Sequence, residues 1–198
     1  MLVVVTSRLA QSAGIAVLVL FLSTPLARAW AEAPLSVDAA AGESAAVSLA
    51  DAILTAENHR PGSQAADAVL MKRGNKLIYD VKTLLVNEFW EGEIDAQSGR
   101  VLGQGTLTPV ARLDEEETAE LAALLKSKLM LKDAVALAEK ATDATAISAR
   151  IEERNGRVVF EVLVLTDRSV SQVIAVDLKD GMVRMSDDRS RATVGRSR

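Results

Sequence analysis

The sequence of 198 residues contains no cysteine and a single histidine, His59. Without cysteine the protein has no disulfide, no thiolate nucleophile and no thiolate metal ligand. A zinc site takes three or four His, Cys or carboxylate ligands, and the HExxH motif needs two histidines, so neither is predicted. His59 stands two residues before Pro61, where we expect an exposed turn residue rather than the positioned base of a Ser-His-Asp triad. The sequence therefore predicts no enzyme activity, no metal and no cofactor.

Aromatic side chains and positive charge are also scarce. Aromatics make up 3% of the residues although 49% are hydrophobic, so alanine, valine, leucine and isoleucine must fill the interior. The formal net charge of −4 argues against a nucleic-acid partner, because phosphate binding needs an excess of lysine and arginine.

The first thirty residues have the composition of a secretory signal. Arg8 is the only charged residue before the apolar run Gly14–Leu22, and small-x-small cleavage patterns end at Ala29 and Ala31. The run is shorter than the roughly 20 residues that cross a bilayer. We therefore predict a Sec-type signal at 1–29, cleavage near Ala29 or Ala31, a periplasmic or secreted protein and no stable membrane insertion afterwards. An uncleaved anchor is the alternative.

The most informative feature is a repeat with a period of about 82 residues. Asp51 and Asp133 are 82 positions apart, and so are Asp95 and Asp177, whereas Tyr79 and Phe160 are 81 apart. A fixed period with matching chemistry is typical of a duplicated structural unit.

Each copy predicts one helix followed by an antiparallel sheet. Four apolar residues with helical spacing open each copy: Leu49, Ala52, Ile53 and Ala56, then Leu131, Ala134, Val135 and Ala138. Ser48 is a good N-cap for the first helix, whereas Met130 stands at that position in the second. A short strand, a Gly-Asn or Asn-Gly turn and two further alternating strands follow, so the predicted class is α+β, twice.

The remaining segments complete the predicted domain plan. We expect a flexible lead-in at 30–46, a first domain at 47–105, a helical linker at 106–128, a second domain at 129–186 and a disordered basic tail at 187–198. The pattern leaves the relative placement of the two units open.

The shared residues resemble the PepSY domain. The resemblance rests on a leucine-x-x-Asp-Ala helix, an aromatic-x-Val strand and a closing Asp-x-x-x-Gly-x-Val, which are Leu49, Asp51, Ala52, Tyr79, Val81, Asp95, Gly99 and Val101, then Leu131, Asp133, Ala134, Phe160, Val162, Asp177, Gly181 and Val183. It implies two tandem PepSY-like (cystatin-like) units, each a helix packed on a three- to four-stranded antiparallel sheet, without enzymatic activity. Members of the family occur in the propeptides of secreted metallopeptidases and as freestanding envelope proteins.

Individual polar and aromatic residues mostly have structural interpretations. Asp95 and Asp177 precede Gly turns, where aspartate bonds its own backbone, rather than forming an acid pair or a cation site. Tyr79 and Phe160 are expected in the core. Phe89 and Trp90 have polar residues at the matching positions, so they are contact candidates or else cover an edge of the core.

The predicted function is that of a non-catalytic envelope module that binds another protein, through sheet edges and a cleft between its two domains. A peptidase or a sensor domain is the expected partner. A periplasmic chaperone-like or stress-related structural protein is the alternative.

Overall fold

The computed structural model describes residues 44–112, 115–166 and 171–185. The predicted signal at 1–29, nearly all of the lead-in at 30–46 and the tail at 187–198 lie outside these residues.

Two runs of elements follow one another along the chain, with the same order in each. The first half contains α2 (Leu49–His59), β1 (Gln64–Arg73), β2 (Lys76–Leu85), β3 (Glu88–Asp95) and β4 (Val101–Pro109). The second half contains α4 (Leu131–Thr142), β5 (Thr145–Arg154), β6 (Arg157–Leu165), β7 (Ser171–Asp177) and β8 (Val183–Met185). Between them lie the 3-10 turn η2 (Val110–Arg112) and the helix α3 (Glu115–Lys126).

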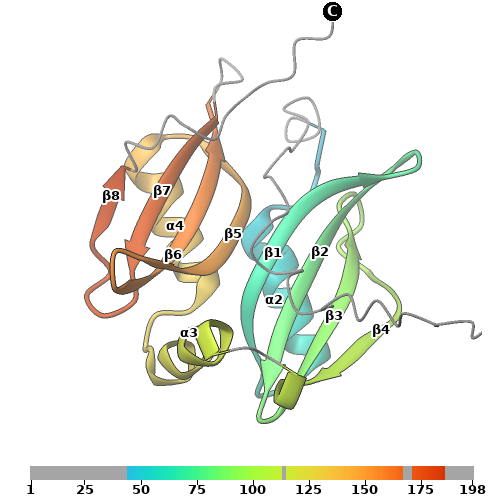
Figure 1. The fold of residues 1–198 in the computed structure, drawn as a ribbon. Coiled ribbons are helices and arrows are strands. Elements are labelled where there is room, and N and C mark those ends of the chain that lie inside the picture. Colours follow the sequence, from blue (N-terminus) through green and yellow to red (C-terminus); the bar gives the residue numbers. More distant parts are fainter. Residues whose placement is uncertain (1–43, 113–114, 167–170, 186–198) are drawn as a thin grey trace, which may run out of the picture.

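All strands belong to one antiparallel sheet of eight, in the order β4-β3-β2-β1-β5-β6-β7-β8 (Figure 1). The sheets that the resemblance implies for the two halves are thus joined edge to edge, and this strand pairing is the relative placement that the sequence left open. The first strand of each half is also longer than the predicted short strand, because both β1 and β5 span ten residues. Each of these two strands pairs with its own hairpin partner along one edge and with the other half along its second edge.

The junction of β1 and β5, which we call the seam, is short and symmetric. Only three residue pairs form it, with Ala68 opposite Ala149 at the centre and the pairs Asp67–Arg150 and Val69–Ser148 on either side. Ala68 and Ala149 are 81 residues apart and occupy matching positions in the two halves, opposite Val81 and Val162 respectively. The seam therefore has the self-complementary form of a twofold interface.

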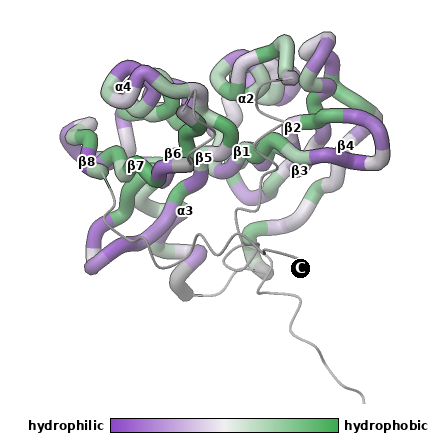
Figure 2. Tube along the Cα trace, turned by 90° about the horizontal axis from the view of Figure 1, so that it is seen from above, coloured by the Kyte–Doolittle hydropathy of each residue, from purple (hydrophilic) through white to green (hydrophobic). Residues whose placement is uncertain are grey.

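The helices cover the sheet on both faces (Figure 2). Helices α2 and α4 lie side by side on one face and pack on the strands of their own half and on each other. Helix α3 lies on the opposite face, below the seam, where Leu121 and Leu124 are buried. We call this second face of the sheet the open face, since α3 covers only part of it. The predicted linker is thus a packed element, because its leucine stripe needs an apolar partner.

Local chemistry explains how the helices begin. The Ser48 hydroxyl accepts a hydrogen bond from the Asp51 backbone N–H at 3.1 Å, so the first helix has the predicted N-cap. Met130 occupies the N-cap position of α4 without a side-chain cap, as its chemistry predicts. No helix within the described ranges has the length and apolar character that a membrane crossing requires.

Candidate functional site

The aspartates that close the third strand of each half shape matching turns. Asp95 Oδ1 accepts hydrogen bonds from the backbone N–H of Ser98 at 2.8 Å and of Gln97 at 3.0 Å, and also from the Ser98 hydroxyl. Because these bonds favour the carboxylate, they lower the pKa of Asp95 below its usual value. Asp177 Oδ1 accepts from the Lys179 N–H at 2.9 Å. The structural interpretation of both aspartates is confirmed, because each bonds the backbone of its own turn.

Two glutamates that the sequence pattern contains acquire a role only in the structure. Glu57 at the end of α2 accepts the Ala65 N–H at 3.1 Å, and Glu139 in α4 accepts the Ala146 N–H at 2.9 Å. In each half the carboxylate thereby fixes the start of the next strand to the helix. Glu57 and Glu139 are 82 residues apart and follow Ala56 and Ala138, so they belong to the repeated pattern, but that pattern does not reveal their backbone partners on the next strand.

The aromatic residues predicted for the core are there. Phe160 is fully buried, and Tyr79 is 2% exposed with its hydroxyl donating to the Val47 carbonyl oxygen at 2.6 Å. Burial raises the pKa of the Tyr79 hydroxyl to about 12.

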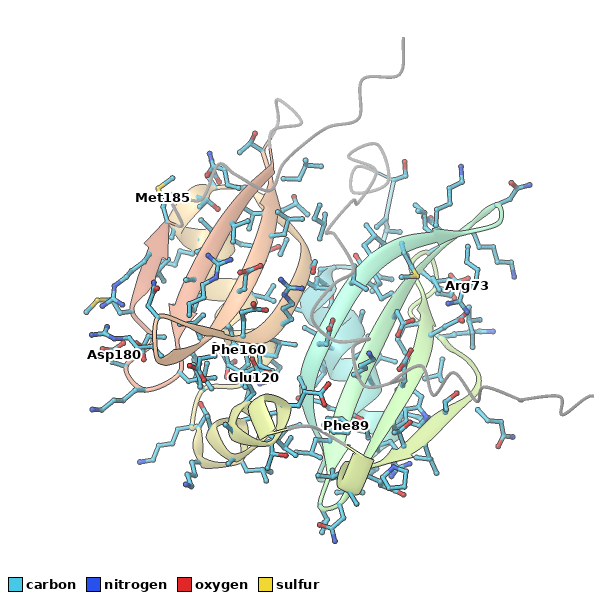
Figure 3. The ribbon with its side chains drawn as sticks, in the orientation of Figure 1. Arg73, Phe89, Glu120, Phe160, Asp180 and Met185 are labelled. Carbon is cyan, nitrogen blue, oxygen red and sulfur yellow. The ribbon has the colours of Figure 1, made fainter. Side chains whose placement is uncertain are left out.

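Phe89 and Trp90 are both covered by the protein itself. Phe89 is 4% exposed and lies at the end of the sheet that α3 covers, where Figure 3 also shows Glu120. Trp90 is 2% exposed and lies on the other face, with its ring centroid 5.2 Å from that of His59. Neither ring forms an exposed surface in this structure. Of the two interpretations left open by the sequence, covering an edge of the core describes their positions.

A glycine bulge in β4 makes room for Trp90. Three residues of β4, Gly103, Gln104 and Gly105, stand opposite the single residue Gly92 of β3. The Trp90 Nε1–H donates to the Gln104 carbonyl oxygen at 2.9 Å. A Cβ on Gly105 would lie 2.3 Å from Trp90 Nε1, so only glycine allows this approach. The Gly-Gln-Gly sequence is therefore an edge-strand bulge that lets β4 close over the indole.

A row of charged side chains of alternating sign crosses the open face and the seam. Its members are successive register partners on five adjacent strands: Glu91 on β3, Lys82 on β2, Asp67 on β1, Arg150 on β5 and Glu161 on β6. Two of the neighbouring pairs are ion pairs, Lys82–Glu91 with N···O 3.5 Å and Arg150–Glu161 with 3.2 Å. Opposite charges on neighbouring strands stabilise the register across the sheet.

Carboxylates are crowded in the first-half part of this row. Burial raises the pKa of Asp67 to about 6, although Lys82 and Arg150 act in the opposite direction. Burial and the nearby Glu91 also raise the pKa of Asp80 above its usual value. On this part of the sheet, the attraction of the nearby cations therefore does not cancel the rise in carboxyl pKa that burial causes.

A shallow hollow of about 460 Å³ opens beside these carboxylates and reaches β4. Its charged lining is Arg73, Asp80, Glu91 and Glu93, and the Gly103–Gly105 bulge forms its outer wall. Arg73 forms ion pairs with Glu93 and with Asp80, the latter at 3.9 Å. Across residues 44–112, 115–166 and 171–185, no group of three or more His, Cys, Asp or Glu residues is arranged to hold a metal ion.

The two ends of the sheet differ. In the described part of the chain no strand pairs with the outer side of β4 or of β8. Strand β4 spans nine residues and carries the half-exposed Leu107. Strand β8 spans three residues, ends at the exposed Met185 (Figure 3) and follows the exposed Met182. Unpaired backbone groups along an edge can accept a further strand.

Comparison with known proteins identifies the first half. Residues 46–104 match the family described as "Peptidase propeptide and YPEB domain", or PepSY. No curated protein matches the sequence. Among solved structures, the crystal structure of a "putative lipoprotein" from Clostridium difficile 630 is similar at 20% identity and a TM-score of 0.42, over 77% of this chain and 96% of that one. This likeness is too distant to carry an argument. The match covers α2, β1, β2, β3 and the start of β4 as far as Gln104, and by it this chain contains a PepSY domain at residues 46–104.

Proposed function

We propose that this chain is a non-catalytic protein-binding module of the bacterial envelope, which regulates a peptidase or the extracytoplasmic domain of a sensor. The observation that carries the proposal is the combination of a propeptide-type PepSY domain with a long, uncharged edge strand, β4, at the end of the sheet. An edge strand binds an extended segment through backbone hydrogen bonds without any reactive group.

The proposal includes a second PepSY-like unit in α4 and β5–β8. Its support is the equivalence of local geometry in the two halves. The register shifts between Ala65 and Asp67 in β1, and between Ala146 and Ser148 in β5. The matching turn glycines, Gly99 and Gly181, have φ values of 68° and 67°. Such details follow from a shared ancestor more readily than from independent origins.

The proposed location is the periplasm or the cell exterior. It is supported by the signal-like sequence of residues 1–29 and by the PepSY family, whose members are propeptide and envelope domains. The proposed binding surface excludes a cleft between the units, because the seam joins their sheets directly.

Site-specific crosslinking in the native envelope tests the proposal. A photoreactive amino acid is placed at Thr106 on β4, at Arg184 on β8 or, as a matched exposed control, at Leu54 on α2. We expect one discrete adduct from an edge position, identified by mass spectrometry as a peptidase or a sensor domain, and none from Leu54.

Two results would contradict it. A ladder of many weak adducts from all three positions would indicate the chaperone-like alternative. Adducts no stronger than those of a cytoplasmic control protein carrying the same photoreactive residue would remove the protein-binding function altogether.

A further inference from the structure

We propose that β4 binds an extended basic peptide segment of the partner, whose lysine or arginine side chains, at alternating positions, lie over the hollow beside Asp80, Glu91 and Glu93. This inference rests on the proposed function and specifies the chemistry of the partner.

The geometry of β4 allows one more strand. The segment Thr106-Leu107-Thr108 is straight, follows the bulge and pairs on its inner side with Glu91, Trp90 and Phe89. It carries no charge and presents Leu107, which is 53% exposed. Natural edge strands usually carry lysine, proline or a bulge that discourages pairing. Here the bulge and Pro109 lie at the two ends of this segment and leave the segment itself unprotected.

The charges on the neighbouring strands indicate which charge the side chains of the added strand should carry. Around the row and the hollow, β1–β3 contribute four carboxylates against two cations: Asp67, Asp80, Glu91 and Glu93 against Arg73 and Lys82. The alternating row ends on β3 at Glu91, whose side chain is 47% exposed. Its register partner on β4 is the uncharged Thr106. Because Thr106 adds no charge at the position opposite Glu91, the nearest place from which a further cation could approach this carboxylate along the row is the next strand outward.

The distances are compatible with this pairing. A strand added to β4 lies two strand spacings, about 9.6 Å, from β3. The long stem of lysine and the glutamate side chain together bridge that separation, because the Thr106 side chain between them is short. The hollow, about 460 Å³ in volume, leaves room for the ends of such side chains.

Among the residues of the second half that the structure describes, no equivalent surface is found. Its outer strand β8 pairs with β7 at only three positions, Ile174, Ala175 and Val176. Arg150 and Arg154 both form ion pairs with Glu161 on β6, and Arg150 also pairs with Glu152 on β5. These carboxylates of the second half are therefore already paired with arginine. An electrostatic preference for a basic segment is therefore expected at the β4 end alone.

The test measures binding of synthetic nonapeptides to the full chain isolated from the envelope of expressing cells. The probe alternates lysine with threonine or valine, and its two comparisons carry glutamate or glutamine in place of lysine. A fourth peptide keeps the lysines but has every second backbone nitrogen methylated. We expect measurable binding of the lysine peptide, none of the glutamate peptide and a loss of binding on backbone methylation, since strand addition needs the N–H donors.

Variants locate the site. The double change Glu91→Gln and Glu93→Gln removes two partly exposed carboxylates, each of which would form only a weak ion pair with the peptide, so it should weaken binding about tenfold. The matched control is Glu152→Gln, which also removes a carboxylate paired with an arginine, at 3.2 Å, but lies on β5. The control should leave affinity unchanged, and circular dichroism melting should show all variants folded.

The outcomes separate this inference from the proposed function. Equal binding of the lysine and glutamine peptides, or full binding of the methylated peptide, would overturn the β4 proposal. So would an equal loss of affinity in the control variant. If envelope crosslinking nevertheless captures a discrete peptidase or sensor through β8, the binding function stands and only this site fails. Crosslinking of the chain to a second copy through Thr106 would instead assign the edge to self-association.

Discussion

The two halves of the sheet share their interior and differ at their edges. Within the halves, Tyr79 and Phe160 are both buried, Glu57 and Glu139 both bond the start of the next strand, and Asp95 and Asp177 both bond the backbone of the closing turn. At the edges, Trp90 corresponds to Gln172, and β4 spans nine residues where β8 spans three. The comparison indicates that the fold constrains the repeated residues, whereas the unshared residues determine which strand is available to a partner.

Removing the indole tests this contrast most strongly. Trp90→Ala should lower the free energy of unfolding by about 3–5 kcal/mol, because it opens a cavity beneath the β4 bulge. Gln172→Ala, at the matching position of the second half, should change it by less than about 0.5 kcal/mol. Urea unfolding of both variants provides the measurement. Equal losses would mean that the two edges are supported in the same way.

Acid titration tests the asymmetry of the seam. Asp67 corresponds to Ser148 in the second half, and its pKa is raised from 3.8 to about 6. A raised carboxyl pKa means that the folded protein binds the proton more tightly than the unfolded chain. Asp67 should therefore stabilise the fold as the pH falls from about 6 to about 4, by at most about 3 kcal/mol.

The variant Asp67→Asn should lack this component. The unfolding free energy of the natural protein should therefore rise relative to that of the variant as the pH falls from 7 to 4. Subtracting the two titrations cancels the contributions of the other carboxylates. A difference that is constant with pH would contradict the raised pKa.

The bulge glycines sharpen the comparison within β4 itself. Gly103 and Gly105 have nearly equal φ values, 71° and 70°. Alanine at either position should therefore incur about 1–2 kcal/mol of backbone strain. Only at Gly105 would the added Cβ meet Trp90 Nε1, at 2.3 Å, whereas nothing lies within 4 Å of a Cβ at Gly103.

Gly105→Ala should consequently cost at least about 1 kcal/mol more than Gly103→Ala. Thermal unfolding of the two variants measures the difference, and the Trp90 fluorescence maximum should move only for Gly105→Ala. Equal costs would show that the indole does not depend on the bulge.

Local patterns in the sequence predicted much of the fold. The i, i+3, i+4 spacing from Leu49 and from Leu131 identified both buried helix faces. The aspartates before Gly99 and Gly181 identified the closing turns, since that turn forms among neighbouring residues. Local patterns could not explain Gly105, because the group that requires a glycine there is the Trp90 ring, fifteen residues away in the chain.

By itself the sequence determined the helix faces, the turns and the PepSY resemblance, because these depend on residues close together in the chain, and its fixed period predicted a repeat. Tertiary structure alone decided that the two halves share one sheet, that α3 lies on its open face and that a charge row crosses the seam. The physical reason is that strand pairing uses backbone groups that every residue carries. Which edge meets which is therefore settled by the packing of whole elements, as at Ala68 and Ala149, where two small side chains allow the seam to form.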